Sequence, residues 1–468
     1  MKNKLITSSL LYTIGNLFIQ GLAFITLPIY TRVISKEVFG QFNLYMAWVG
    51  LCTLFIGLQT GGSLSSAKVK YSEKEYNRYA VSAFTISNLF FVLFLLVAFL
   101  IKDYISSFFG LTSSLFLIMI VQSYATYISS FLGQYFIQQQ KVLFNLALSA
   151  FSSLVNVALS IFLIYVWDDD FLARVLGNFV PGILVAVIAT TFLYTRKEPI
   201  LDKKYIPFIV TVSVPLIFHL LGHQLLNQLD RIMLGKIKTV NEVALYSFGY
   251  NVGLVIQIVL GSLNTAWVPW FFEARKSQRN NLSKIIHQYL SVGLFLTLGY
   301  LTIFPELANI LGGKSYSGSH QFIALIVVSY FFVFLYTFPV NIQFYHANTK
   351  YIPIGTLFAA GVNFILNLVL IPNIGIYGAA LATVLSYLSL LVFHHLVTKK
   401  LYNYKDVNIS TYLFYSLMTM GYAILMTIFL HSLLIRWFFG LLVLVVFLFY
   451  YKNEVQFLVK KFITGGSY

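Results

Sequence analysis

Long apolar stretches of about twenty residues alternate with short polar links along almost the whole chain. The first stretch covers residues 10–33 and the last covers residues 433–451. A helix needs roughly twenty apolar residues to cross the hydrocarbon core of a bilayer, whereas the strands of a membrane β-barrel show alternating segments of about ten residues. The pattern therefore predicts an all-α integral membrane protein.

The apolar stretches predict about fourteen transmembrane helices. They cover residues 10–33, 41–61, 79–101, 115–138, 142–166, 171–194, 205–229, 243–268, 285–304, 320–345, 352–372, 375–397, 409–430 and 433–451. The link at Asn373 is the shortest of all. No small-residue cleavage site follows the basic start, so we expect the first stretch to be retained as a helix.

Composition supports the membrane class. Hydrophobic residues make up 59% of the 468 residues and charged residues only 10%, whereas soluble domains carry about 25% charged residues. The single cysteine, Cys52, excludes a disulfide framework and a cysteine-based metal site. The net charge of +16 does not indicate a nucleic-acid partner, because the lysines and arginines lie in short links rather than on one basic domain.

The distribution of positive charge predicts the orientation of the chain. With fourteen helices, 22 of the 31 Lys and Arg residues fall on the side that holds the N-terminus, and 9 fall on the other side. Cytoplasmic links carry the excess of Lys and Arg in membrane proteins. We therefore expect both termini in the cytoplasm and the acidic cluster of residues 168–170 outside.

Two parts of the chain show the same arrangement of helix, outer arginine, short loop and helix. Arg32 occupies this place after the first stretch and Arg231 after the seventh. Asn156 and Asn363 likewise precede the sixth and twelfth stretches, which open with Gly177 and Gly375. Duplicated bundles are common in transporters. The alternative is chance similarity among apolar helices.

The repeat predicts three parts. Residues 1–198 form an N-lobe of helices 1–6, and residues 199–400 form a C-lobe of helices 7–12. Residues 401–468 form helices 13 and 14 with a cytoplasmic tail.

Polar side chains recur at helical spacing in the first two stretches of each half. Such residues normally face the bundle interior or a wet cavity in membranes. We expect them to line a cavity between the lobes. The candidates, in chain order, are Asn16, Gln20, His219, His223, Asn227, Asp230, Arg231, Asn251 and Gln257.

Other readings remain for these and similar residues. The histidines could equally be satisfied interior residues, and no carboxylate or cysteine accompanies them at metal-ligand spacing. Asp230 and Arg231 are adjacent, so separate partners are favoured over a mutual salt bridge. Helix packing is favoured for the polar and small residues of the fourth and fifth stretches. These are Gln122, Thr126, Ser129, Gly133, Asn145, Ser149, Ser152 and Asn156.

Three arginines near outer helix ends, Arg32, Arg174 and Arg231, could simply reach toward lipid headgroups. Phosphate binding is the sharper hypothesis, because a guanidinium stays charged and offers paired donors to phosphate oxygens. Arg275, Lys276 and Arg279 could attract the same group on the cytoplasmic side, although a positive-inside loop is the favoured explanation for them.

Four stretches give the chain a resemblance to a known family. They are residues 31–40 (TRVISKEVFG), 228–235 (QLDRIMLG) with 244–246 (ALY), 363–367 (NFILN) and 370–383 (LIPNIGIYGAALAT). The chain resembles polysaccharide flippases of the O-antigen and capsule repeat-unit type. This family belongs to the superfamily of multidrug, oligosaccharidyl-lipid and polysaccharide exporters. The similarity spans about residues 10–397, and Ala244 stands where the family tends to have glycine.

The resemblance implies a V-shaped pair of six-helix lobes around a cationic central cavity. It implies a transporter, not an enzyme, that flips undecaprenyl-diphosphate-linked oligosaccharide repeat units to the outer leaflet of the bacterial cytoplasmic membrane by alternating access. No cofactor or metal is expected. The implied partners are the lipid-linked oligosaccharide and membrane lipids, with a polysaccharide polymerase and glycosyltransferases as candidate protein partners.

The same picture implies roles for the candidate residues. Arg32 and Arg231 would hold phosphate, and Asp230, His219 and His223 would sense protons or order the arginines. The amides of Asn16, Gln20, Asn227, Asn251 and Gln257 would bind sugar hydroxyls. Arg174 is a further phosphate candidate.

Alternative functions remain within and outside the superfamily. A drug/cation antiporter would need acidic residues deep in helices 1–6, and the middles of those stretches have none. A lipid II flippase would differ only in substrate. A membrane glycosyltransferase would need a catalytic set on a large outer loop, and no link is long enough to hold one. An inert scaffold would not explain polar stripes at matching places.

Overall fold

The structure is a computed structural model that describes residues 21–22, 24–195, 198–277 and 281–452. Its regular elements in these ranges are all helical. The long helices are α2 (Lys36–Ile56), α4 (Glu73–Phe109), α5 (Ser113–Gln138), α6 (Val142–Val166), α7 (Asp170–Tyr194), α8 (Ile206–Ile237), α9 (Val240–Lys276), α10 (Leu282–Gly312), α11 (His320–Tyr345), α12 (Tyr351–Tyr402), α13 (Ile409–Ile428) and α14 (Leu433–Tyr450). The short elements are α3 (Leu64–Lys70) and the 3₁₀ turns η1 (Thr60–Ser63), η2 (Lys203–Tyr205) and η3 (Lys314–Ser319).

Twelve helices in the described ranges are long and apolar enough to cross a membrane. One of them, α12, contains two of the predicted stretches and breaks between them at Gly375, which has φ 57° and ψ −132°. Residues 24–33, at the end of the first predicted stretch, are also helical. The all-α membrane fold predicted from the apolar pattern is therefore confirmed.

The break in α12 explains why residues 370–383 have so specific a sequence. Gly375 has a positive φ, which only glycine adopts without strain. A Cβ added at Gly378 would lie 2.6 Å from the carbonyl oxygen of Leu370, so the backbone after the break passes close to the backbone before it. Gly177 differs from Gly375: it lies inside α7, where an added Cβ would lie 2.1 Å from Ser160 Oγ of α6.

The second predicted helix ends earlier than expected, at Ile56 rather than at residue 61. Leu58 and Gln59 both adopt φ 50°, which stops the helix. Gln59 Nε2 then donates to the carbonyl oxygens of Thr53 (3.2 Å) and Leu54 (3.3 Å). The last carbonyls of a helix have no partner within it. The Gln59 side chain therefore caps the end of α2.

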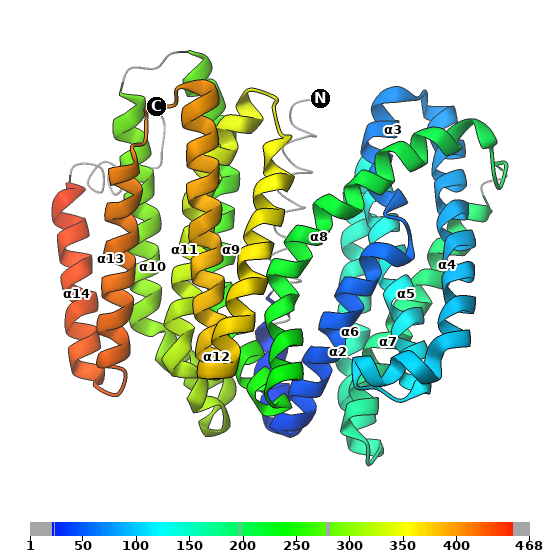
Figure 1. The fold of residues 1–468 in the computed structure, drawn as a ribbon, viewed down its shortest axis with the longest axis horizontal. Helices are drawn as coiled ribbons and strands as arrows, with labels where there is room; N and C mark the ends of the chain where they lie inside the picture. Colours follow the sequence, from blue (N-terminus) through cyan, green and yellow to red (C-terminus); the bar gives the residue numbers. More distant parts are fainter. Residues whose placement is uncertain (1–20, 23, 196–197, 278–280, 453–468) are drawn as a thin grey trace, which may run out of the picture. The chain divides into compact units, whose positions relative to one another are not determined.

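The chain divides into two compact units, Met1–Ala244 and Leu245–Tyr468, called unit 1 and unit 2 here. Unit 1 holds α2 to α8, and unit 2 holds most of α9 and all of α10 to α14 (Figure 1). Each unit is described by itself. The lobe limits expected from the repeat, and the cavity expected between the lobes, stay predictions.

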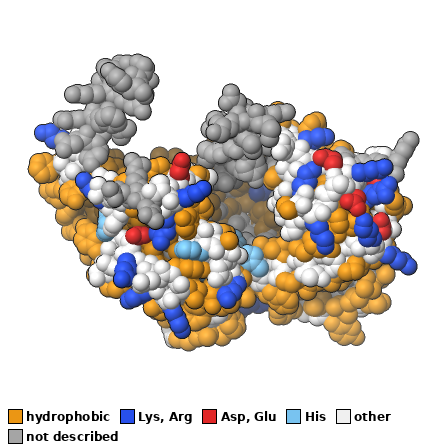
Figure 2. All heavy atoms as spheres, turned by 90° about the horizontal axis from the view of Figure 1, so that it is seen from above, with side chains coloured by type: hydrophobic (Ala, Val, Ile, Leu, Met, Phe, Trp, Pro, Cys, Tyr) orange, Lys and Arg blue, Asp and Glu red, His pale blue; other side chains and the backbone are white. Residues whose placement is uncertain are grey.

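Charged side chains concentrate at the helix ends of each unit. Figure 2 shows Lys and Arg side chains on the face seen from above, with hydrophobic side chains around its edge. Many large apolar side chains are exposed, among them Leu100, Phe162 and Leu434 at 77%, 60% and 82%. A water-soluble domain rarely exposes so much contiguous apolar surface. These flanks suit contact with lipid tails.

Two short corners of unit 1 pack against each other. One joins the first helical segment to α2, and the other joins α8 to α9. A Cβ added at Gly40 would lie 2.2 Å from the carbonyl oxygen of Val240, and one added at Gly235 would lie 2.7 Å from Leu44 Cδ2. Figure 1 shows the beginning of α2 beside the end of α8. The glycines that close residues 31–40 and 228–235 therefore permit this contact.

Gly40→Ala is expected to destabilise the protein, because the new methyl group meets backbone that cannot rotate away. Such overpacking costs about 1–3 kcal/mol. Thermal unfolding of the purified protein in detergent measures it. Gly299→Ala in α10 is the matched control, since nothing lies within 4 Å of its added Cβ. A Gly40→Ala protein as stable as the Gly299→Ala protein would contradict the packing described here.

Candidate functional site

The two corner arginines lie on helix ends that lead into the packed corners of unit 1. Arg32 is exposed, and its Nη1 donates to the carbonyl oxygen of Pro28 at 2.8 Å. Arg231 is only 8% exposed, and its Nη1 donates to the carbonyl oxygen of Asn227 (2.7 Å) and to Gln228 Oε1 (2.9 Å). The helix–arginine–loop–helix arrangement expected at both places is therefore present, with one arginine exposed and the other buried.

A hydroxyl side chain caps the N-terminus of the helix that follows each corner. Ser35 Oγ accepts from the amide of Val38 at 3.2 Å at the start of α2. Thr239 Oγ1 accepts from the amide of Glu242 at 3.3 Å at the start of α9. Such caps satisfy amides that the first turn of a helix leaves without a partner. The two corners thus share a local design as well as an arginine.

The polar stripe of α8 is one connected line on the helix surface. Asn227 Nδ2 lies 3.2 Å from His223 Nδ1 and donates to the carbonyl oxygen of His223 at 3.0 Å. Arg231 then reaches the carbonyl oxygen of Asn227. His219 Nδ1, one turn before His223, is buried without a hydrogen-bond partner in the described part of the chain. Asp230, beside Arg231, is 1% exposed.

The remaining stripe candidates are in different situations. Asn251 and Gln257 are half-buried on α9 in unit 2. On the same helix, Asn264 Oδ1 accepts from Asn341 Nδ2 of α11 at 3.1 Å. Asn16 and Gln20 lie outside the described residues. Five candidates thus lie together on α8, namely His219, His223, Asn227, Asp230 and Arg231. That these five share one cavity with Asn16, Gln20, Asn251 and Gln257 stays a prediction.

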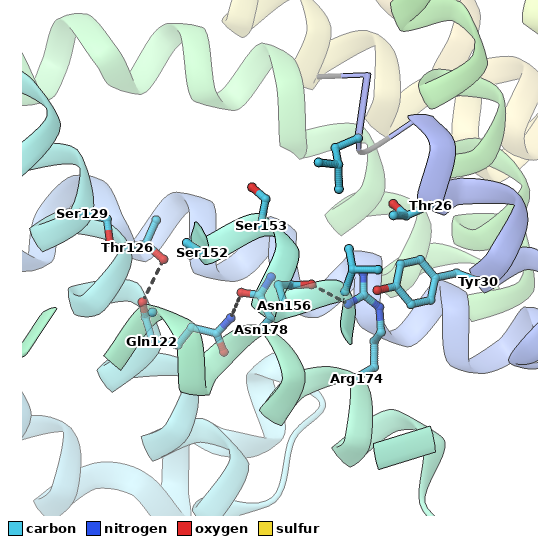
Figure 3. A pocket seen from close by; sticks show the side chains of 13 residues that line it. Thr26, Tyr30, Gln122, Thr126, Ser129, Ser152, Ser153, Asn156, Arg174 and Asn178 are labelled. Atoms are coloured by element: carbon cyan, nitrogen blue, oxygen red, sulfur yellow. Dashed lines mark hydrogen bonds between the residues drawn. The ribbon is translucent and has the colours of Figure 1, made fainter. Parts of the chain in front are cut away.

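A polar cavity of about 370 Å³ lies inside unit 1. Figure 3 shows its lining side chains, which come from the first helical segment, α5, α6 and α7. They are Leu22, Thr26, Tyr30, Gln122, Thr126, Ser129, Ser152, Ser153, Asn156, Val157, Arg174, Asn178 and Gly182. Ligand pockets in proteins commonly have about 300–1,000 Å³. The cavity is therefore large enough for a small ligand.

Arg174 is the cation of this cavity. Its Nη1 donates to Asn156 Oδ1 (3.2 Å) and Ser160 Oγ (2.9 Å) on α6. Its guanidinium carbon lies 3.7 Å from the centre of the Tyr30 ring and 4.3 Å from that of Phe42. Two aromatic faces and two hydrogen bonds thus orient the guanidinium, which therefore does not simply reach for lipid headgroups.

Amide groups form the other end of the cavity. Gln122 Nε2 of α5 donates to Asn178 Oδ1 of α7 at 2.7 Å, and Gln122 Oε1 accepts from the hydroxyl of Tyr45 at 2.7 Å. Thr126 Oγ1 donates to the carbonyl oxygen of Gln122 at 2.9 Å (Figure 3). The bonds to Asn178 and from Tyr45 hold the Gln122 side-chain amide in one orientation, whereas the Thr126 bond goes to the backbone of Gln122.

Helix packing was favoured for the polar residues of the fourth and fifth stretches, and Gln122 does bond to neighbouring helices; five of these residues also line the cavity. Those that line the cavity are Gln122, Thr126, Ser129, Ser152 and Asn156. Packing does hold for Gly133, whose added Cβ would lie 3.0 Å from Asn145 Oδ1. The signal that pointed to a cavity was Arg174 in the following helix, because a guanidinium inside a bundle requires polar neighbours.

Two cations of unit 2 are bound in ion pairs. Arg275 Nη1 lies 2.6 Å from Asp406 Oδ2, which favours a structural role over attraction of a cytoplasmic phosphate. Arg436 of α14 binds Glu306 of α10 with both terminal nitrogens, Nη1 to Oε2 at 3.0 Å and Nη2 to Oε1 at 2.6 Å. The Glu306 pair was not foreseen, because the two residues lie far apart in sequence.

A second hollow of about 1020 Å³ lies in unit 2 among α10, α13 and α14. Lys284, His287 and Gln288 lie at the start of α10, and apolar side chains such as Phe295 and Phe447 line other parts. None of the candidate residues predicted from the sequence lines it.

Comparisons with known proteins agree with this architecture. Two proteins of Haemophilus influenzae are each 25% identical to the chain. One, described as an uncharacterized membrane protein, aligns over 74% of this chain and 85% of its own length. The other, described as Lsg locus putative protein 1, aligns over 75% and 87%.

Solved structures of transporters share the fold. The lipid II flippase MurJ in an inward closed conformation superposes with a TM-score of 0.75 at 16% identity, covering 95% of this chain and all of that one. The MATE multidrug transporter DinF-BH superposes with a TM-score of 0.59 at 12% identity, covering 86% and 96%. At such identities the likeness establishes the fold alone.

The family assignment comes from the sequence match. A family model described as polysaccharide biosynthesis protein matches residues 5–275, which is more than half of the chain. The match includes both corner arginines and the whole cavity of unit 1. The chain is therefore a multi-pass membrane protein with the MurJ and MATE transporter fold, and it belongs to the polysaccharide biosynthesis protein family.

Proposed function

We propose that the protein flips undecaprenyl-diphosphate-linked oligosaccharide repeat units from the cytoplasmic to the outer leaflet of the bacterial cytoplasmic membrane by alternating access. The observation that carries this proposal is the connected polar line of His223, Asn227 and Arg231 on α8. It offers imidazole, amide and guanidinium groups along a membrane-spanning helix. Such groups suit a substrate with sugar hydroxyls and a diphosphate.

The arginines are the proposed phosphate ligands. Arg32 and Arg231 lie near the ends of the helices that lead into the two packed corners of unit 1. A guanidinium binds phosphate oxygens with two parallel hydrogen bonds. Asn16, Gln20, Asn227, Asn251 and Gln257 are the proposed sugar ligands, and Asp230, His219 and His223 the proposed proton-sensing groups. The lipid tail stays in the bilayer.

The chemistry of the unit 1 cavity disfavours the drug/cation antiporter alternative. Such a protein would need carboxylates to bind a cation inside the N-terminal helices. The thirteen described residues that line this cavity include one arginine and no acidic residue. A lipid II flippase remains the alternative that differs only in the substrate. It is tested by comparing the rate of flipping of lipid II with that of the undecaprenyl-diphosphate-linked oligosaccharide.

Deletion of the gene in its bacterial host tests the proposal in the cell. The lipid-linked oligosaccharide is expected to accumulate in the cytoplasmic leaflet, where glycosyltransferases make it, and surface polysaccharide is expected to fall. The wild-type gene restores export. Unchanged polysaccharide and no accumulated intermediate in the deletion strain would refute the proposed function.

A further inference from the structure

The cavity inside unit 1 combines one cation with many neutral polar groups. Its lining includes six hydroxyl-bearing and three amide side chains in addition to Arg174. These are Thr26, Tyr30, Thr126, Ser129, Ser152, Ser153, Gln122, Asn156 and Asn178. All these described residues belong to unit 1.

The guanidinium of Arg174 keeps part of its donor set available. Nη1 donates to Asn156 and Ser160, and the rings of Tyr30 and Phe42 lie against the faces of the guanidinium plane. Nε and Nη2 have no hydrogen-bond partner in the described part of the chain, and no acidic residue there pairs with Arg174. An arginine held this way can offer its free edge to an oxyanion.

Tyr30 supplies an independent sign of a ligand. Its side chain is 4% exposed and lines the cavity, and its hydroxyl has no hydrogen-bond partner among the described residues. Buried polar groups almost always have a partner, so each exception needs an explanation. A hydroxyl-bearing ligand beside Arg174 would provide the missing partner.

The size of the cavity favours a sugar over a bare anion. A volume of about 370 Å³ would hold on the order of a dozen waters at about 30 Å³ each. A single inorganic anion would leave most of that volume and most of the hydroxyl groups unused. A hexose ring with its hydroxyl groups would reach the serines, threonines and amides as well as Arg174.

We propose that this cavity binds an acidic sugar unit, with the oxyanion on Arg174 and the ring hydroxyls on the serine, threonine and amide groups of α5, α6 and α7. The inference rests on the proposed function: the acidic sugar would belong to the transported repeat unit. The same chemistry could come from an anionic lipid headgroup or from a free anion, and the test separates these sources.

The test measures binding of D-glucuronate, D-glucose and inorganic phosphate to the purified full-length protein by ligand-observed NMR. Glucuronate is expected to bind about tenfold more tightly than glucose. Its carboxylate makes a charge-assisted bond to Arg174, and glucose has no charged group to make one. Arg174→Gln is expected to remove that difference, and Arg174→Lys to restore part of it.

A second pair of variants guards against a folding defect in Arg174→Gln. Ser153 lines the cavity and makes no hydrogen bond in the described part of the chain, so Ser153→Leu fills the cavity while Arg174 stays in place. Ser149→Leu is the matched control, because Ser149 lies one turn earlier on α6 and does not line the cavity. Glucuronate binding is expected to weaken only in Ser153→Leu.

Four results would overturn the inference. The first is equal binding of glucose and glucuronate, and the second is unchanged glucuronate binding in Arg174→Gln. The third is phosphate binding as tight as glucuronate binding. The fourth is glucuronate binding that is lost in nanodiscs of phosphatidylglycerol but kept in nanodiscs of phosphatidylcholine. The third result would indicate an oxyanion site only, and the fourth a lipid headgroup site.

Transport assays separate this inference from the proposed function. A protein that flips lipid-linked oligosaccharides but binds no glucuronate would refute the acidic-sugar site and leave the function standing. A protein that binds glucuronate through Arg174 but flips no such lipid would refute the function and leave the site standing.

Discussion

Arg231→Ala is expected to reduce polysaccharide export by about tenfold to a hundredfold while the protein still inserts into the membrane. A hydrogen bond to a charged group contributes about 1.5–3 kcal/mol, which corresponds to that range. The side chain is 8% exposed and is held by Asn227 and Gln228. Export is measured as surface polysaccharide, and insertion as the amount of protein in the membrane fraction.

Three further variants complete this prediction. Arg32→Ala is expected to reduce export as well, because Arg32 is the corresponding arginine of the other corner. Arg231→Lys keeps the charge without the paired donors and is expected to fall between wild type and Arg231→Ala. Lys36→Ala removes a nearby cation at the start of α2 and serves as the control. Wild-type export from both alanine variants of the arginines would remove them from the site.

Arg436→Met is expected to destabilise unit 2 by about 1–3 kcal/mol, because it removes two charge-assisted hydrogen bonds and leaves the partly exposed Glu306 without its partner. The Arg436 side chain is 5% exposed and that of Glu306 31%, and two charge-assisted hydrogen bonds join them across α14 and α10. Arg436 Nη1 also donates to the carbonyl oxygen of Thr302 at 2.7 Å. Thermal unfolding in detergent measures the loss.

The double variant Arg436→Met/Glu306→Leu is expected to recover part of that stability, since no charge is then left without its partner. Lys102→Met is the matched control: its pair with Asp103 is largely exposed on the aspartate side, at 69%, and such pairs contribute about 0–1 kcal/mol. If Arg436→Met unfolded at the same temperature as Lys102→Met, the pair would not be what holds α14 to α10.

The sequence predicted the membrane helices well because the apolar core of a bilayer imposes a length that hydropathy can detect. It also located the two corners, since an arginine between apolar stretches is conspicuous. It missed the end of α2, where Leu58 and Gln59 adopt positive φ without a glycine at either position. The sequence did predict a short link at Asn373, where Pro372 and Gly375 stand close together, and the structure breaks α12 at Gly375.

The cavity of unit 1 was harder to predict than the stripe of α8. Spacing places Gln122 and Thr126 on one face of a helix, but it cannot say whether that face meets another helix or an empty space. The answer depends on side chains from other helices, such as Tyr30 and Arg174, which approach only in the folded protein. The ion pair of Arg436 and Glu306 could not be predicted for the same reason, since it joins two helices that meet only in the folded protein.

Reconstitution tests the central claim most directly. The purified protein is placed in liposomes that carry an undecaprenyl-diphosphate-linked oligosaccharide from the host, and the fraction that reaches the outer leaflet is measured with an enzyme that modifies only exposed glycans. We expect movement faster than in empty liposomes, slower with Arg231→Ala, and faster for this lipid than for lipid II. A rate equal to that of empty liposomes would contradict the proposed function, and a preference for lipid II would contradict the proposed substrate.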